Sequence, residues 1–403
     1  MTLAARYRLG VFWVFAALSI FLIGAGGLGL SSSVGFVGLL TLPLLVLPAW
    51  QAARAAPLAA GLATAAIAWF CMTSAWSVYP RADELYKLAL LTPLYIAAVY
   101  ACMRMGAREV RLAAPVLLTG ALALGAFFAI EALAGLPIAV AFQGWLHGLT
   151  DPEGALGIAT RRLSRGTTAF IMLAGPAGLW FWLKGGYAWR SAALFLLATS
   201  AIAAASFEVA ANIIAFAGGL VALAFALRWP RMTLQVILAG TALTVLVAPP
   251  IMGALVAFFP DSLAERLPLS WHWRLEIWGF AVERIAERPL LGHGLGAGRT
   301  LSETVMLRGI EIDRMPIHAH NAGLHIWMET GAVGALLSAW TLLALARSAG
   351  RAVLGAPLSA GLACAGSVWL VSVMLGYGVW QEWHHGALAF AAGSAFILLR
   401  GRS

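Results

Sequence analysis

The sequence predicts an all-α polytopic membrane protein. Of its 403 residues, 62% are hydrophobic and 11% are charged, whereas soluble domains contain about 45–50% apolar and about 25% charged residues. The apolar residues gather in stretches of about 20, which is the length that an α-helix needs to cross a bilayer. Arginines, together with Lys87 and Lys184, separate these stretches.

Twelve such stretches follow one another along the chain, and each is expected to be a transmembrane helix. They lie at residues 9–30, 34–50, 56–76, 88–103, 113–135, 166–183, 191–206, 209–227, 233–259, 322–346, 355–380 and 385–399. The first is long enough to remain as a span rather than a cleaved signal peptide. We therefore interpret residues 1–403 as a single integral membrane domain.

Basic residues indicate how the chain is oriented. If the N-terminus is cytoplasmic, every inner connection carries at least one Arg or Lys, as the positive-inside rule requires. Both termini are then cytoplasmic. This placement also accounts for much of the formal charge of +9, so we expect membrane lipids and no nucleic acid as partners.

Two outer loops, 136–165 and 260–321, are expected to be the only long connections. They collect ten of the twelve basic residues that the orientation leaves outside. Long loops are usually functional or disordered, and tryptophans such as Trp145 and Trp278 favour order here. These loops are expected to carry the functional residues.

The second of these loops contains an amphipathic helix, predicted over 271–288. At about 100° per residue, Leu275, Trp278 and Ile285 fall on one face and the glutamates on the other. Arg274 lies in the middle of the apolar face, with Arg288 nearby on it. An arginine here either extends its charged end to the headgroups or points into a closed site and binds an anion; the second interpretation is favoured.

The motif "RPLLGHGLGAGRT" follows this helix, and Gly292, Gly294, Gly296 and Gly298 alternate in it. No strand precedes it, so a dinucleotide-binding loop is not favoured. We predict a turn in which the backbone passes close to another segment.

The motif "HAHN" places His318, His320 and Asn321 directly before an apolar helix. The motif allows three interpretations: a metal site, which lacks an evident third ligand; interfacial residues bonded to water or headgroups; and acid–base chemistry by a neutral imidazole. We favour the last, with Asn321 as the cap of the following helix.

Three arginines, Arg161, Arg162 and Arg165, precede the predicted start of the sixth span at Gly166. Exposed amides at a helix start and positive side chains can together receive an anion. For Arg161 or Arg162 alone, a solvated charge run is equally plausible, and Arg165 is the strongest candidate. Glu208 at the start of the eighth span is expected to pair with an outer arginine.

Three motifs together carry a family resemblance: "SAWSVYP", "RLEIWGFAVERIAERPLLGHGLG" and "HAHNAGLHIWMETGAVGALL". The chain resembles the O-antigen ligase and polymerase superfamily of bacterial envelope glycosyltransferases. The resemblance implies a GT-C-like membrane fold and transfer of a glycan from undecaprenyl diphosphate on the periplasmic face of the bacterial inner membrane, without cofactor or metal.

By the same resemblance, the family histidine that precedes asparagine matches His320. The family arginine that opens the amphipathic helix matches Arg274, and the family arginine cluster matches Arg161, Arg162 and Arg165. Many members carry Ser-Arg-Gly near the start of the eighth span, where this chain has Ser206, Phe207 and Glu208. Any role of that arginine is therefore absent here or taken by another loop.

These observations predict an O-antigen ligase that joins an undecaprenyl diphosphate-linked O-antigen to lipid A–core. His320 is the expected general base, with Arg161, Arg162, Arg165, Arg274 and Arg288 on the diphosphate and His318 and Asn321 in support. Alternatives within the superfamily are an O-antigen polymerase and a protein O-oligosaccharyltransferase. A lipid-linked sugar flippase is the alternative from another class, supported by "VAPPIMG", which is predicted to break the ninth span.

Overall fold

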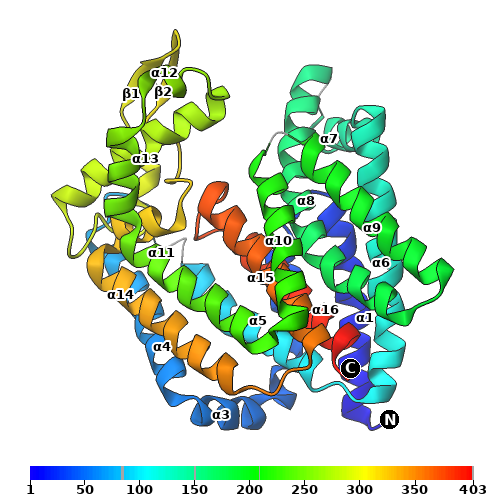
Figure 1. Cartoon of the computed structure of the whole chain (residues 1–403). Coiled ribbons are helices and arrows are strands. Elements are labelled where there is room, and N and C mark those ends of the chain that lie inside the picture. Colours follow the sequence, from blue (N-terminus) through cyan, green and yellow to red (C-terminus); the bar gives the residue numbers. More distant parts are fainter. Residues whose placement is uncertain (83–85, 149–150, 208, 402–403) are drawn as a thin grey trace.

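The computed structural model describes residues 1–82, 86–148, 151–207 and 209–401. Nearly all of this chain is helical (Figure 1). The N-terminal part contains α1 (Leu3–Gly24), α2 (Leu30–Thr41), η1 (Leu42–Leu44), α3 (Val46–Ala55), α4 (Pro57–Met72), η2 (Thr73–Trp76), α5 (Tyr86–Met103), α6 (Ala107–Ala134), α7 (Pro137–His147), α8 (Pro152–Lys184), α9 (Tyr187–Ser206) and α10 (Ala211–Arg228). The remainder contains α11 (Pro230–Phe258), α12 (Asp261–Ala264), α13 (Leu269–Glu287), η4 (Ala297–Arg299), β1 (Thr304–Leu307), β2 (Ile310–Asp313), α14 (Ala322–Arg351), α15 (Ala356–Leu375) and α16 (Glu382–Leu399).

Ten helices of the described chain are long and apolar enough to cross a membrane, so the protein is a multi-pass α-helical membrane protein. They are α1, α4 with η2, α5, α6, α8, α9, α10, α11, α14 and α15. The predicted spans 34–50 and 385–399 are not among these ten helices. The first is the shorter apolar helix Leu30–Leu44, and the second is α16, whose first turn holds Glu382, His384 and His385.

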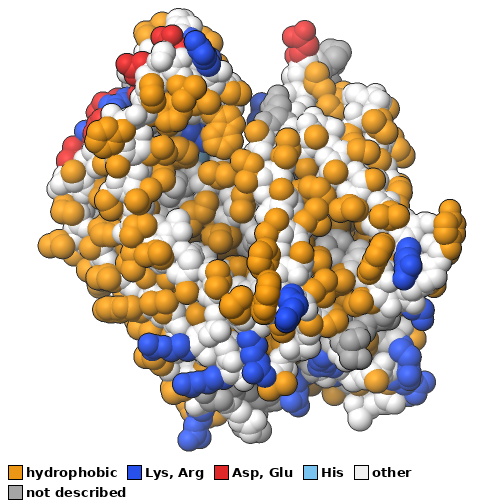
Figure 2. Space-filling view, in the orientation of Figure 1, with side chains coloured by type: hydrophobic (Ala, Val, Ile, Leu, Met, Phe, Trp, Pro, Cys, Tyr) orange, Lys and Arg blue, Asp and Glu red, His pale blue; other side chains and the backbone are white. Residues whose placement is uncertain are grey.

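Charge and apolarity divide the surface into bands (Figure 2). Lys and Arg gather at the lower end, where both termini lie, and hydrophobic side chains cover the middle. Asp and Glu appear at the upper end in this view. We call the lower end the basic end; which side of a membrane it faces remains a prediction.

The core lies around α8 and α15, whose most apolar windows are 72% and 61% buried. Phe128 of α6 stacks on Phe170 of α8 at 5.2 Å between ring centroids. Small residues allow close helix approach: a Cβ on Gly166 would lie 2.4 Å from the carbonyl oxygen of Ile23. Such small-residue crossings are typical of membrane helices, whose association depends on close packing.

Residues 261–321 form a separate body on α11 and α14, which we call the head. It contains α12, α13 and the antiparallel hairpin of β1 and β2, and its core is built from Leu275, Trp278, Phe280 and Met315 with Met328 of α14. In Figure 1 the head lies at the upper left and α7 at the upper right. Figure 2 shows the molecule hollowed between these two projections.

The predicted helix start at Gly166 is wrong. The segment 136–165 is mostly helical, and α8 begins at Pro152, where Asp151 caps it by accepting hydrogen bonds from Glu153 N at 3.1 Å and Gly154 N at 2.9 Å. Alanine, leucine and arginine are strong helix formers, so their run continues the span beyond the bilayer-length stretch. The backbone amides around Arg161–Arg165 are therefore inside a helix and do not form a helix-start anion site.

The predicted break at "VAPPIMG" is also wrong, because α11 runs through Pro249 and Pro250. Proline removes the hydrogen bond to the carbonyl four residues earlier, which for Pro249 is Val245. Trp327 of α14 replaces it by donating Nε1–H to Val245 O at 2.8 Å. Neighbouring helices commonly satisfy such freed carbonyls in membranes, so the helix needs no break.

A discontinuity occurs instead in α14, at Gly331, whose φ of 67° and ψ of −170° are not helical. The helix resumes at Ala332, which donates its amide to Pro289 O at 2.8 Å. A Cβ on Gly331 would lie 2.2 Å from Leu290 O. Carbonyls of the segment after α13 therefore accept backbone amides that follow the interruption. Only glycine fits at position 331, because a side chain would clash with this segment.

Candidate active site

Two adjacent carbonyls at the C-terminal end of α15 bring the main predicted residues together. Arg274 donates Nε–H to Leu375 O at 3.1 Å, and the next carbonyl, Gly376 O, accepts a hydrogen bond from His320 Nδ1 at 2.7 Å. Arg274 comes from α13 and His320 from the segment before α14. The end of α15 thus serves as a common anchor for a cation and an imidazole that are distant in sequence.

Arg274 is buried on the inner face of α13, with 8% exposure. It also donates Nη1–H to Ser270 O at 2.7 Å, and its guanidinium lies 4.9 Å from the ring centroid of Trp271. Burial lowers the pKa of Arg274, but a guanidinium remains charged at any ordinary pH. Within the described chain no carboxylate forms an ion pair with it, so its positive charge is not neutralised.

The hydrogen bond to Gly376 O fixes the tautomer of His320. A carbonyl only accepts, so Nδ1 carries the proton and Nε2 keeps its lone pair. Burial, followed by the positive charge of Arg274, lowers the pKa of His320 to about 4. The residue has a φ of +47°, in the left-handed region that few side chains adopt. The arrangement therefore holds a neutral imidazole with Nε2 as its proton acceptor.

His318 and Asn321 support this geometry. The rings of His318 and His320 lie 4.3 Å apart between centroids, and His318 Nδ1 accepts the backbone N–H of His320 at 3.3 Å. Burial is the largest cause that lowers the pKa of His318, and the charge of Arg299 contributes. Asn321 Oδ1 accepts Leu324 N–H at 3.1 Å, which confirms the predicted helix cap.

A buried glutamate that sequence reasoning missed joins the surrounding segments. Glu329 of α14 is 0% exposed, and its carboxylate accepts hydrogen bonds from Gly296 N at 2.7 Å, Gly298 N at 3.2 Å, His325 Nε2 at 3.1 Å and Trp380 Nε1 at 2.6 Å. Four donors compensate for the cost of burying this carboxylate. The sequence signal that could have identified Glu329 is its spacing of one helical turn from His325 in an otherwise apolar stretch.

The glycine segment passes close to other backbone, as predicted. A Cβ on Gly294 would lie 2.3 Å from Ser77 Cα, and one on Gly292 would lie 2.5 Å from the carbonyl carbon of Glu329. Both glycines also have positive φ, at 95° and 71°. His293 is held within this segment, with Nε2 2.7 Å from Arg284 O. The segment therefore packs tightly against α14 and η2.

Arg165 borders the site through Tyr377, the residue after Gly376. Tyr377 Oη lies 3.2 Å from Thr168 Oγ1, and Arg165 lies one turn before Thr168 on α8. The buried Nε of Arg165 has no hydrogen-bond partner, and its charge favours ionisation of Tyr377, although burial raises the pKa of Tyr377 to about 12. Arg165 therefore has an unsatisfied donor close to the cluster.

The other predicted arginines differ in position. Arg162 donates to His147 Nε2 at 2.9 Å, and Arg161 is exposed. Arg288 is exposed at the C-terminal end of α13, about 21 Å along the helix from Arg274 at 1.5 Å per residue, so it does not join the cluster. Glu208 lies outside the described residues.

Arg299 is a further residue of the site that was not predicted from the sequence. Its guanidinium lies over the ring of Tyr79, 5.6 Å from the centroid, and its charge acts on His318. It comes from η4, directly after the glycines that Glu329 binds. The cluster therefore combines neutral imidazoles with the charges of Arg274 and Arg299, and such an arrangement suits an anionic ligand beside a hydroxyl that loses a proton.

Comparison with known proteins gives partial matches. No family model matches the chain. Over 132 residues it is 26% identical to a protein of Rickettsia typhi and 28% identical to one of Rickettsia conorii, both named "Putative polysaccharide ligase". The match covers 31% of this chain and 32% of each relative. The protein is thus similar to these two proteins over about a third of its length, and it spans about a third of theirs.

Proposed function

We propose that this protein is a glycosyltransferase of the bacterial inner membrane. It transfers an O-antigen glycan from undecaprenyl diphosphate to a hydroxyl of lipid A–core, on the periplasmic face. The observation that carries the proposal is the pair of neighbouring carbonyls that hold Arg274 and His320 side by side. The family resemblance and the polysaccharide-ligase relatives support the same class of reaction.

In the proposed reaction, His320 Nε2 accepts the proton of the acceptor hydroxyl. The hydroxyl oxygen attacks the anomeric carbon of the glycan, and the bond from that carbon to the phosphate oxygen breaks. The diphosphate leaves with the bonding electrons, and Arg274 stabilises the charge that develops on it. Attack opposite the leaving group inverts the anomeric centre. Arg165 and Arg162 extend the positive surface along α8.

The charge of Arg274 adds to the effect of burial, which is the larger cause of the low pKa of His320. In the free protein it helps to keep the pKa of His320 at about 4, which is low for a base at neutral pH. A bound diphosphate would offset this positive charge and raise the pKa of His320 towards neutrality. Donor binding would therefore make His320 a stronger base than it is in the free protein.

The test is glycan transfer by the full chain in detergent. The purified protein is supplied with an undecaprenyl diphosphate-linked glycan and, in separate reactions, with lipid A–core, a second lipid-linked repeat, or an acceptor protein. Transfer to lipid A–core is the expected result. Transfer only to the second repeat or only to the protein would instead identify a polymerase or a protein O-oligosaccharyltransferase.

A flippase is the alternative from another class, and it would leave every supplied molecule chemically unchanged. Its sequence support was a broken ninth span, and α11 is continuous. The break at Gly331 of α14 has its amides satisfied by Pro289 and Leu290, whereas transporters use broken helices to bind cargo. Absence of transfer to all three acceptors, with folded protein and intact donor, would reject the glycosyltransferase.

A further inference from the structure

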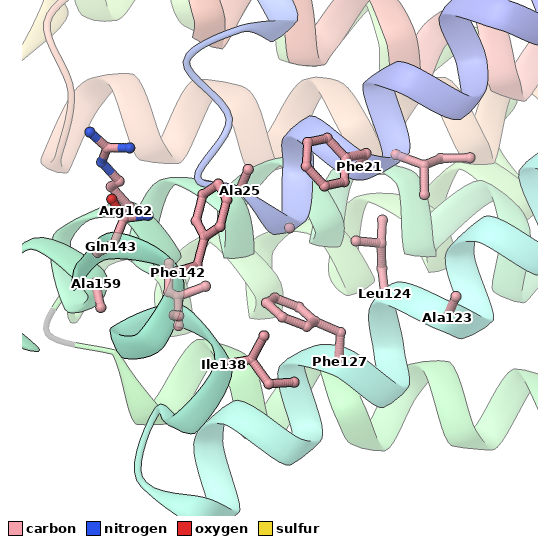
Figure 3. A pocket seen from close by; sticks show the side chains of 14 residues that line it. Phe21, Ala25, Ala123, Leu124, Phe127, Ile138, Phe142, Gln143, Ala159 and Arg162 are labelled. Carbon is pink, nitrogen blue, oxygen red and sulfur yellow. The ribbon is translucent and has the colours of Figure 1, made fainter. Parts of the chain in front are cut away.

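An apolar pocket lies between α1, α6, α7 and α8, beside the arginines of α8. Its volume is about 310 Å³, at the lower end of the range for small-molecule sites. Figure 3 shows Phe21, Phe127 and Phe142 around it, with Arg162 and Gln143 towards one end. Ile138 and Phe21 among its lining residues are 49% and 62% exposed, so the pocket opens to the outside between apolar side chains, as a lipid-chain site requires.

The polar end of this pocket leads towards the candidate active site. Arg162 lines the pocket, and Arg165 follows one turn later on α8 with an unsatisfied, buried Nε. Thr168, one further turn along, contacts Tyr377 at 3.2 Å, and Tyr377 is adjacent to the carbonyl that holds His320. Along α8, Arg162 therefore lines the pocket and Arg165 lies between it and the residue that contacts Tyr377.

A second pocket shows what is distinctive about the first. It lies between α8, α9, α10 and α15, has a volume of about 360 Å³ and is also apolar. Among the described residues that line it there is no Arg or Lys. Of these two pockets, the first therefore differs in having an arginine, Arg162, in its described lining.

We propose that the pocket of α1, α6, α7 and α8 holds the diphosphate-proximal part of the donor's polyprenyl chain, with Arg162 and Arg165 on the diphosphate. This inference rests on the proposed function. The occupant is a branched hydrocarbon with a strongly anionic head, because the pocket is apolar along its length and positive only where Arg162 lines it. The rest of the long chain remains in the bilayer.

The experiment uses the full chain in detergent and a benzophenone-bearing farnesyl diphosphate, with cross-linked peptides identified by mass spectrometry. Cross-links are expected in α6 and α7, near Phe127 and Phe142. Undecaprenyl diphosphate should compete, whereas phosphatidylglycerol at the same concentration should not. Labelling elsewhere, or equal competition by phosphatidylglycerol, would overturn the inference.

Two variants make the test specific to this pocket. Ile138→Trp narrows it from its exposed rim and should reduce labelling at least about tenfold. Leu197→Trp, at a similarly exposed position in the second pocket (42% against 49% for Ile138), should leave labelling unchanged. Arg162→Gln should weaken competition by undecaprenyl diphosphate about tenfold, because a charge-assisted hydrogen bond is lost. It should not alter competition by undecaprenol, which has no phosphate.

The same preparations separate the two proposals. If glycan transfer proceeds at the wild-type rate in Ile138→Trp and labelling is unchanged, the pocket assignment is wrong and the proposed function stands. If the probe labels the pocket as expected and no acceptor receives glycan, the pocket binds a lipid diphosphate and the proposed function is wrong. Circular dichroism and size-exclusion profiles that match the wild type establish that each variant is folded.

Discussion

The arginines on the two sides of α13 have different partners. On the outer face, Arg314 from the β2 side lies 2.9 Å from Glu283, 3.6 Å from Glu303 and 3.9 Å from Glu276, so its charge is neutralised. On the inner face, Arg274 is held by the carbonyls of Ser270 and Leu375. Carbonyls fix its orientation and leave its net charge intact. The number of arginines in a loop is therefore a poor guide to an anion site, and the type of acceptor is a better one.

The largest expected effect is that of removing the proposed base, His320, which lies beside Arg274. His320→Asn should reduce the transfer rate by about 10²–10⁴, the usual contribution of general acid–base catalysis. Asparagine tolerates the left-handed backbone of position 320, so the fold should persist. Rate is measured as product per minute at saturating donor. Transfer at the wild-type rate would show that another group accepts the proton.

Arg274→Gln tests whether an arginine held by neutral acceptors carries the function. Loss of one preorganised charge-stabilising donor costs about 10²–10³ in rate, and that loss is expected in kcat. Arg274→Lys keeps the charge but loses the planar fork, so it should recover only part of the activity. Equal activity in Arg274→Gln and the wild type would remove Arg274 from the mechanism.

The pH profile tests the coupling between Arg274 and His320. The neutral imidazole is the active form, so activity falls as the pH drops through the pKa of His320. The acid limb of kcat/KM, which reports the free protein, should lie near pH 4. At pH 5 the kcat/KM of the wild type should retain a roughly 30-fold larger share of its plateau value than that of a protein whose free histidine had the ordinary pKa of 6.5.

Two further curves sharpen this result. The acid limb of kcat should lie at a higher pH than that of kcat/KM, because the bound diphosphate offsets the charge of Arg274. In Arg274→Gln the limb of kcat/KM should also move to a higher pH. Limbs that coincide in all three curves would mean that Arg274 does not act on the base.

Glu329 tests a smaller effect, because it positions groups and does not touch the reacting atoms. Glu329→Gln keeps the shape but turns an amide N–H₂ towards donors such as Gly296 N or Trp380 Nε1. A buried donor without a partner costs about 1–3 kcal/mol, which should lower Tm. The rate should fall about tenfold through misplacement of the histidines, with the acid limb of kcat/KM unchanged. A shifted limb would instead indicate direct electrostatic control by this carboxylate.

Features that depend on neighbouring residues could be predicted from the sequence. The apolar stretches predicted the membrane helices, the 3.6-residue period predicted α13, and Asn321 was identified as a cap because capping involves residues only three positions apart. Proximity of Arg274 to His320 was inferred from residue chemistry and the family resemblance. The carbonyls of α15 that hold both residues had no signal in the sequence.

What could not be predicted depends on contacts between distant segments. Glu329 bonds to glycines 31 and 33 residues earlier and to Trp380, 51 residues later, and no local period reveals such pairs. Trp327 replaces the bond that Pro249 removes, so the proline pair was misinterpreted as a break. Arg288 was assigned to the site because its direction on a helical wheel matched that of Arg274, although a wheel ignores the distance along the axis.

The smallest expected effect is that of replacing Arg314, which packs against the outer face of α13. Arg314→Gln breaks a network with three glutamates and a cation–π contact to Phe280 at 4.9 Å. Partly exposed ion pairs contribute about 0–1 kcal/mol each, so Tm should fall by a few degrees and the transfer rate should change less than about twofold. The matched pair Arg314→Gln and Arg274→Gln thus separates a structural arginine packed against the outer face of α13 from a functional one on its inner face. A loss of transfer in Arg314→Gln as large as in Arg274→Gln, with the fold intact, would mean that neutralisation by carboxylates does not distinguish the two faces.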